Sequence, residues 1–252
     1  PRLSLLVNYS SKLSSRIGGG LGYKAPTIFT EETERIQYKG VAAISSRLNT
    51  LEKSYGFNAD INYKTKLFED AVDLSFNQLF FYTRINQPLL LLQTPSQYNL
   101  SNVDGHFDSR GMETNIKLGY HDFKLFLGYT YTETFLHKAN SKTENFLTPR
   151  HRINSVLMYE VEEKWKLGLE AYHFSKQQLS DGATGKPYWI CGFMAEKLWE
   201  KFSIYINFEN FFDTRQTRFD TIYTGPISNP IFRDIYAPLD GFVVNGGIKL
   251  KL

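Results

Sequence analysis

The sequence predicts an all-β protein, an antiparallel transmembrane β-barrel with about eleven strands, and three observations lead to this prediction. The connections alternate between short and long along the chain, as in a barrel with tight turns on one side of the membrane and long loops on the other. The clearest strand pattern, Glu52–Leu67, is long enough for the roughly 9–11 residues that a tilted membrane strand needs. No apolar run approaches the roughly 18 residues of a membrane helix.

The expected connections fall into two classes in strict alternation. The short ones are at Ser11–Leu13, Phe68–Asp70, His121–Asp122, Glu162–Glu163 and Trp199–Glu200, and the long ones are at about Lys24–Thr50, Gln87–Gln97, Lys138–Pro149, Leu179–Lys186 and Asp213–Pro238. A helix is expected nowhere except for a short turn within Thr30–Ser46.

The segment Glu52–Leu67 gives the clearest strand pattern. Phe57 and Ile61 belong to an apolar and aromatic parity, and Asp60 and Lys64 belong to a polar one. Successive side chains of a strand point to opposite faces, so one face is predicted to be apolar and the other polar. The same alternation recurs at Phe123–Thr132, Lys164–Ala171, Phe202–Glu209 and Phe242–Leu252.

Charged residues on the polar parity favour a water-filled interior, because isolated charges are costly in a dry core. A soluble β-sandwich with one wet face also alternates. That alternative accounts poorly for the strand length and not at all for the sidedness of the loops. Trp165, Trp189 and Trp199 are expected at the membrane interfaces, with Trp199 at the rim that carries the tight turns.

Composition excludes several classes of function. The net charge of +3 is spread along the chain without a basic cluster, so no nucleic-acid partner is expected. Cys191 is the only cysteine, which excludes an intrachain disulfide and a cysteine-based metal site. An odd strand number would leave the first strand starting on the outside, so the chain is expected to lack an N-terminal portion with an odd number of strands.

Five motifs, in order along the chain, resemble the C-terminal half of the barrel of TonB-dependent outer-membrane receptors. They are Ser15–Thr27 (SRIGGGLGYKAPT), Leu51–Phe57 (LEKSYGF), Tyr98–Asn102 followed by Ser109–Glu113 (YNLSN, SRGME), Leu147–Arg152 (LTPRHR) and Asn210–Arg215 (NFFDTR). The chain departs from the pattern at its last residue, Leu252, where outer-membrane proteins usually have an aromatic residue.

The resemblance implies a 22-strand barrel around a plug, with residues 1–252 as its C-terminal portion and with the plug and the first half of the barrel absent from this chain. It implies a Gram-negative outer-membrane location and uptake of a scarce solute, such as a ferric siderophore or cobalamin, with energy from TonB. The implied partners are the TonB system through the missing plug, the lipid bilayer and a small-molecule or chelate ligand. Neither catalysis nor a cofactor is expected. A passive porin-like channel and a secreted β-sheet binding or scaffold module remain as alternatives.

Ligand-binding residues are expected among polar and aromatic residues of the long loops, where aromatic faces with polar tips suit ligands of mixed character. The predicted set is Arg35, Tyr38, Gln93, Tyr98, Tyr223, Arg233 and Tyr236. No metal site is predicted, because no histidine has a second histidine or cysteine at a ligand spacing. The glycines of Gly18–Gly22 are expected to clear room for a plug rather than to cradle a phosphate.

Overall fold

The computed structural model describes residues 1–45, 47 and 49–250. Within them the main sheet has 12 strands, and neighbouring strands are antiparallel. Its path runs through β1 (Arg2–Asn8), β2 (Leu13–Lys24), β3 (Glu52–Leu67), β4 (Val72–Asn86), β7 (His106–Tyr120), β8 (Phe123–Lys138), β10 (His151–Val161), β11 (Trp165–Phe174), β14 (Tyr188–Leu198), β15 (Phe202–Glu209) and β18 (Val243–Leu250). The twelfth strand, β9 (Ser141–Glu144), pairs only with the end of β8 among the described residues.

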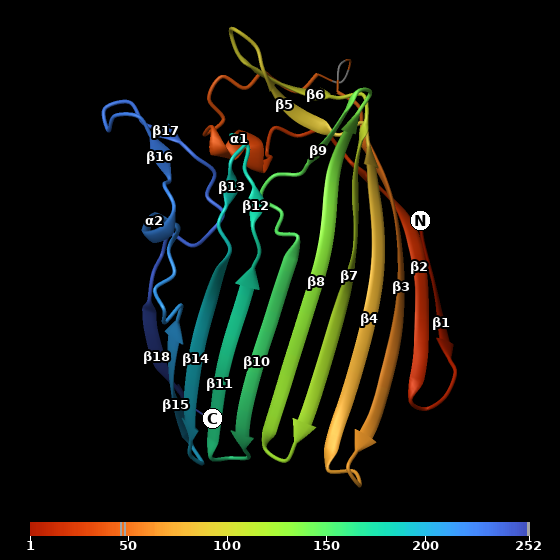
Figure 1. The fold of residues 1–252 in the computed structure, drawn as a ribbon, viewed down its shortest axis with the longest axis vertical. Coiled ribbons are helices and arrows are strands. Elements are labelled where there is room, and N and C mark those ends of the chain that lie inside the picture. The colour runs from red at the N-terminus through yellow and green to blue at the C-terminus, as the bar shows by residue number, and fades with distance from the viewer. Residues whose placement is uncertain (46, 48, 251–252) are drawn as a thin grey trace.

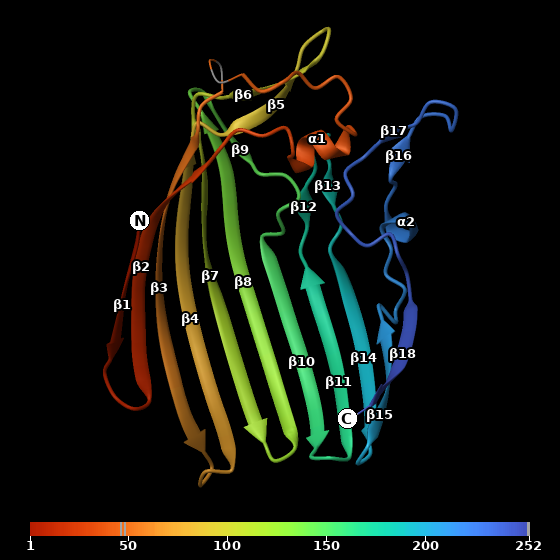
Figure 2. The same ribbon diagram turned by 180° about the vertical axis from the view of Figure 1, so that it is seen from behind.

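The path is a single curved wall in which each strand pairs with the wall strand that follows it along the chain (Figure 1, Figure 2). β1 forms one edge and β18 the other, and the described strands do not close into a ring. The predicted all-β antiparallel architecture and its eleven long strands are therefore confirmed. β3 and β15 have the bounds that the alternation of their sequences indicates.

The tight turns lie at one end of the wall and the long loops at the other (Figure 1). Several boundaries differ from the prediction, among them the following two. Leu13 begins β2 instead of ending the first turn. The segment Tyr98–Asn102 is not part of a wall strand, because it forms β6 and pairs with β5 (Leu89–Gln93) in a separate hairpin. The long loop between β4 and β7 therefore extends to Gly105.

The two faces of the wall have opposite character. Large apolar side chains of one parity are exposed, among them Phe57 at 52% and Ile61 at 49%. We call this the outer face. Residues of the other parity line the hollows of the wall and form the inner face; Asn77, Asn115 and Asn154, for example, line one hollow together. This arrangement is the one predicted from the alternation in Glu52–Leu67.

Aromatic residues flank the apolar band of the outer face. Phe123 and Tyr159 lie near the tight turns, with ring centroids 4.8 Å apart, and Tyr131 lies nearer the loops. From Phe123 to Tyr131 the strand advances about 26 Å, at ~3.3 Å per residue. At the roughly 35–45° tilt of barrel strands this is about 20 Å of height, most of the apolar band of about 25 Å in an outer-membrane barrel. No helix within the described residues is long and apolar enough to cross a membrane.

The loops carry their own secondary structure. They contain the helices α1 (Glu31–Arg35) and α2 (Gln216–Phe219), the hairpin of β5 and β6, and the short hairpins of β12 (Gln177–Gln178) with β13 (Thr184–Gly185) and of β16 (Tyr223–Thr224) with β17 (Ile231–Phe232). Thr30 caps α1 in a reciprocal capping box with Thr33, as expected of a helix that starts at a threonine. A small hydrophobic core of Leu179, Tyr236 and Ala237 lies in the loops.

Candidate functional site

The first group of loops joins the segment between β2 and β3 to the hairpin of β5 and β6. Tyr98 accepts a backbone hydrogen bond from Ala42 at 2.8 Å and donates one to Gly40 at 2.8 Å. Glu52 accepts from the backbone N–H of Leu89 at 2.9 Å, and Asn49 donates to the carbonyl of Leu100 at 2.6 Å. These bonds fix the two loops to each other. We call the two loops, residues 25–51 and 87–105, the first loop group.

Four of the predicted ligand-binding residues belong to this group. Arg35 is the last residue of α1. Tyr38 follows that helix, is 40% exposed and packs edge-to-face against Phe29 with ring centroids 5.9 Å apart. Gln93 and Tyr98 are register partners at the tip of the β5–β6 hairpin, where Gln93 is exposed and Tyr98 is half-buried. The fold thus brings residues from two separate loops into one assembly.

The second loop group consists of residues 175–187 and 210–242, and it holds the other three predicted residues. Tyr223 lies in β16 and is 40% exposed. Arg233 donates to Asp181 at 2.8 Å and to Asp220 at 3.2 Å. Tyr236 is 8% exposed and belongs to the small core of the loops. Arg233 and Tyr236 therefore hold the loops together, and Tyr223 is the most exposed of the three.

The charged network of the second loop group is well satisfied. The Tyr236 hydroxyl donates to Asp220 at 2.7 Å and accepts from the backbone N–H of Lys186 at 2.8 Å. Burial and the bond to Asp220 raise the pKa of Tyr236 to about 12. The hydrogen bond from Arg233 holds the pKa of Asp181 below its ordinary value. Burial opposes the charged form of Asp220, but the hydrogen bonds from Tyr236 and the Thr221 backbone, together with the charges of Arg233 and Lys186, outweigh it and lower the pKa of Asp220.

Below the loops, the inner face of β2 and β3 forms a hollow with few side chains. Gly18, Gly20 and Gly22 share the inner parity of β2, and Arg16 and Asn58 lie beside them in the lining. An added Cβ at Gly18 would lie 2.8 Å from the Asn58 Oδ1 atom, so a larger residue there would displace the Asn58 amide. The glycine segment leaves a smooth polar surface on the wall.

Polar side chains cover the inner face across the middle of the sheet. Asn62, Asn77 and Asn115 are successive register partners on β3, β4 and β7, and Asn77 donates to Asn62 at 2.8 Å. Nearer the tight turns, Glu160 accepts from Lys124 at 2.9 Å and lies 3.0 Å from the Lys166 ammonium. An inner face of amides and paired charges is suited to a water-filled lumen.

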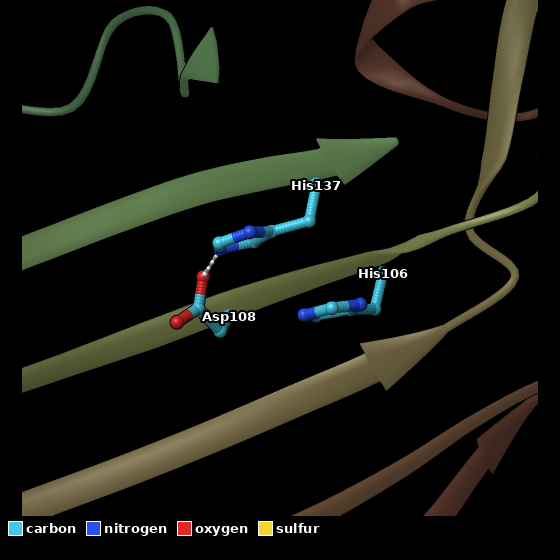
Figure 3. A group of neighbouring side chains, drawn as sticks. All are labelled: His106, Asp108 and His137. Carbon is cyan, nitrogen blue, oxygen red and sulfur yellow. Dashed lines mark hydrogen bonds and ion pairs between the residues drawn. The ribbon is translucent and has the colours of Figure 1, made fainter. Parts of the chain in front are cut away.

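The outer face carries a group that the sequence analysis did not predict. His106, Asp108 and His137 place their ligand atoms within 4.8 Å of one another, at the ends of β7 and β8 nearest the loops (Figure 3). His106 and His137 are far apart in the chain, but they are register partners in the β7–β8 hairpin. A register count across the hairpin from the tight turn at His121–Asp122 would have revealed the pair from sequence.

The family model for the TonB dependent receptor-like β-barrel matches residues 1–211 of this chain. No curated protein sequence matches.

Solved structures of larger proteins share the fold. A ferric enterobactin receptor (PfeA) double mutant from Pseudomonas aeruginosa has a TM-score of 0.70 at 16% identity, with 98% of this chain and 39% of that chain covered. The FrpB iron transporter from Neisseria meningitidis has a TM-score of 0.68 at 12% identity, covering 98% of this chain and 38% of that one. The siderophore receptor PirA from Acinetobacter baumannii has a TM-score of 0.66 at 14% identity, covering 99% and 40%. The chain thus spans about two fifths of the length of these structures.

Proposed function

This chain belongs to the TonB-dependent receptor β-barrel family, and on that premise we propose that it forms part of the barrel of an outer-membrane receptor that imports a scarce solute with TonB energy. Ferric siderophores are the first candidates, because the similar solved structures are described as a ferric enterobactin receptor, an iron transporter and a siderophore receptor. Cobalamin and similar solutes remain candidates on the same premise.

The observation that carries the proposal is the two-faced wall. An apolar outer face with aromatic borders suits the lipid of an outer membrane, and a polar inner face suits a wet lumen. In a soluble protein, Phe57, Ile61 and Leu157 would be an extended apolar surface exposed to water. These exposures therefore favour a membrane wall over a secreted β-sheet module.

Capture of the solute is assigned to the loop end of the wall. Tyr38, Gln93 and Tyr98 lie in the first loop group, and Tyr223 lies in the second. Exposed tyrosine rings and an amide can stack on and hydrogen-bond a polar ligand that also has apolar surface. Arg35 stays in the proposed set as the last residue of α1, three positions before Tyr38 in the sequence.

Uptake by the whole protein tests the proposal. The full-length gene is expressed in a Gram-negative host that lacks its own siderophore receptors, and accumulation of radiolabelled ferric siderophores is measured with and without functional TonB. The proposal expects accumulation that requires TonB. Accumulation that is equal in the two strains would support a passive channel, and absence of accumulation for a panel of siderophores, cobalamin and haem would contradict an uptake receptor.

Loop variants then test the proposed binding residues. Gln93→Ala and Tyr38→Asn are expected to weaken solute binding at least about fivefold, since a useful contact contributes ~1 kcal/mol or more. Asparagine suits position 38 because the backbone there has a φ of 58°. Tyr9→Ala, in a tight turn at the other end of the wall, is the control and should bind normally. Normal binding by both loop variants would remove these residues from the site.

A further inference from the structure

His106, Asp108 and His137 form a compact set of nitrogen and oxygen ligands (Figure 3). The His137 Nε2 atom lies 2.6 Å from the Asp108 Oδ1 atom. The two imidazole rings are stacked, with centroids 4.5 Å apart and planes 7° from parallel. All three side chains are half-buried, so they are partly shielded and still accessible to a small ion.

The backbone holds these side chains together. His106 begins β7 and pairs with His137 near the end of β8, and Asp108 lies two residues further along β7 on the same face. Gly105, just before β7, has a φ of 142°, and an added Cβ there would lie 2.0 Å from the His137 carbonyl oxygen. A glycine at this position therefore allows the start of β7 to lie against the end of β8.

The cluster is on the outer face, away from the lumen. Phe107, Ser109 and Thr134 line a hollow of the inner face, and they alternate in sequence with the residues of the cluster. His137 is six residues beyond Tyr131, which is about 20 Å along the strand. The cluster thus lies past the apolar band, where water and ions have access.

We propose that His106, Asp108 and His137 bind a divalent transition-metal ion, with Zn²⁺ as the ion that fits best. Imidazole nitrogens with a carboxylate oxygen are ordinary zinc ligands, and three protein ligands leave a fourth position for water. The ligand atoms already lie close enough that small side-chain rotations would bring them around one ion. Such an ion would join the start of β7 to the end of β8, at the base of the loops 87–105 and 139–150.

The surrounding charges predict exchangeable rather than permanent binding. Asp108 brings one negative charge to the cluster. Its register partner on β4 is Arg84, and the register partner of His137 on β9 is Lys142, whose ammonium lies 3.8 Å from the centre of the Phe135 ring. Two cations near the site weaken the attraction for Zn²⁺.

Titration of the full-length protein with Zn²⁺ tests the proposal. The protein is purified in detergent micelles, freed of metal and titrated by calorimetry, and we expect saturable binding at one ion per chain. His106→Asn and His137→Asn are each expected to weaken that binding at least about tenfold. The matched control is His121→Asn, which changes a histidine in a tight turn at the other end of the wall and should leave binding unchanged.

A second measurement on the unmodified protein covers the case in which a variant fails to fold. Diethylpyrocarbonate labels accessible histidines, and mass spectrometry locates the label. Zn²⁺ should protect His106 and His137 and should not protect His121. The proposal would be overturned if the unmodified protein showed no saturable binding, or if the His106→Asn and His137→Asn variants both bound Zn²⁺ as tightly as the unmodified protein. Equal protection of all three histidines from the label would also overturn it. The cluster would then be a hydrogen-bonded pair of His137 and Asp108 with the His106 ring stacked on His137.

Discussion

At the scale of single residues, the second loop group shows how one buried hydroxyl can organise two loops. Tyr236 donates to Asp220 and accepts from the backbone of Lys186, while Arg233 joins Asp220 to Asp181. The residues are drawn from the loops 175–187 and 210–242, so this network fixes one loop against the other. The exposed Tyr223 is thereby held on a stable base.

Replacing Tyr236 with phenylalanine tests this role. The variant keeps the ring in the small core, but it leaves the Lys186 N–H without its side-chain acceptor and removes one of the donors to the Asp220 carboxylate. We expect a loss of about 1–3 kcal/mol in the free energy of opening of the second loop group, measured by native-state proteolysis within residues 213–238 at increasing urea. Tyr223→Phe, at an exposed ring in the same loop, is the control. Equal cleavage of the two variants would contradict the role of Tyr236.

The raised pKa of Tyr236 predicts that the stability of the second loop group falls at alkaline pH. The pKa of Tyr236 is about 12 in the folded protein, against an ordinary value of 10.0. The neutral hydroxyl is favoured by folding, so its contribution to stability is complete below about pH 10 and is lost as the pH rises towards about 12. Tyrosinate absorbance of the unmodified protein minus that of Tyr236→Phe should show a step near pH 12. A step near pH 10 would show that the hydroxyl is not held as described.

The lowered pKa of Asp181 predicts that the stability of the second loop group also falls at acid pH. Its pKa is lowered below the ordinary 3.8, chiefly by the hydrogen bond from Arg233. The contribution of this pair is present above about pH 4 and is lost as the pH falls through the lowered pKa. Cleavage within residues 213–238 by an acid-active protease should therefore rise below pH 4, and Asp181→Asn should remove part of that rise. A variant with the same pH profile as the unmodified protein would contradict the prediction.

At the scale of elements, each wall strand depends on which side chain points to which face. On β8, Leu127 lies on the outer face, midway between Phe123 and Tyr131, and is 37% exposed. Thr130 lies on the inner face of the same strand, as its register with Glu113 shows. One strand thus provides both surfaces within a few residues.

Arginine substitutions on β8 test this division. Leu127→Arg places a charge at the middle of the apolar band and is expected to destabilise the protein in liposomes by about 2–4 kcal/mol. Thr130→Arg places the same side chain on the inner face and is expected to destabilise the protein much less than Leu127→Arg does. Unfolding in urea, followed by the loss of heat-modifiable migration on gels, gives the comparison. Equal costs for the two variants would show that the faces are not distinct.

The backbones of β7 and β8 approach closely at Gly111, and replacement of this glycine is expected to destabilise the protein. An added Cβ at Gly111 would lie 2.0 Å from the Tyr131 carbonyl oxygen, whereas at Gly168 the nearest atoms would lie at 4.0 Å. Gly111→Ala is therefore expected to lower the free energy of unfolding by about 1–3 kcal/mol, because the methyl group displaces β7 from β8. Gly168→Ala is expected to leave the free energy of unfolding nearly unchanged. The same urea unfolding measures both. A neutral Gly111→Ala would contradict the close contact.

The long strands could be predicted from sequence because alternation is a local pattern. Glu52–Leu67 and Phe202–Glu209 carry it without interruption, and the structure has β3 and β15 at those bounds. Tyr98–Asn102 could not be placed in the same way, because its pairing with Leu89–Gln93 and its bonds to the loop at Gly40 and Ala42 depend on chain packing. The His106 and His137 pair likewise depends on strand register.

The expected ligand-binding residues were predicted from residue type and loop position alone. That reasoning located Tyr38, Gln93 and Tyr98 in loops that the fold joins, but it could not show burial. Tyr236 has the same residue type as Tyr223, yet it lies in the small core with 8% exposure. Exposure within a loop depends on which other loop covers it, and a local pattern does not contain that information.

At the scale of the whole molecule, the chain is an open wall with an apolar outer face, a polar inner face and loops at one end. This form accounts for the exposed apolar side chains, since Phe57 and Ile61 lie on the outer face. It also accounts for the paired charges near the tight turns, such as Glu160 with Lys124, which face the lumen. The zinc site proposed on the outer face is independent of the uptake route.

The most direct test of this account is a scan of spin-label accessibility along β3 and β8. After Cys191→Ser, single cysteines are placed at successive positions in Gly56–Tyr63 and Leu125–Tyr131 of the full-length protein in liposomes. The account predicts that collision with oxygen dissolved in lipid peaks at Phe57, Ile61 and Leu127, and that collision with a water-soluble nickel chelate peaks at the alternate positions. An accessibility profile without this two-residue period would contradict the assignment of the two faces. So would a profile in which oxygen and the nickel chelate had exchanged their positions of highest collision.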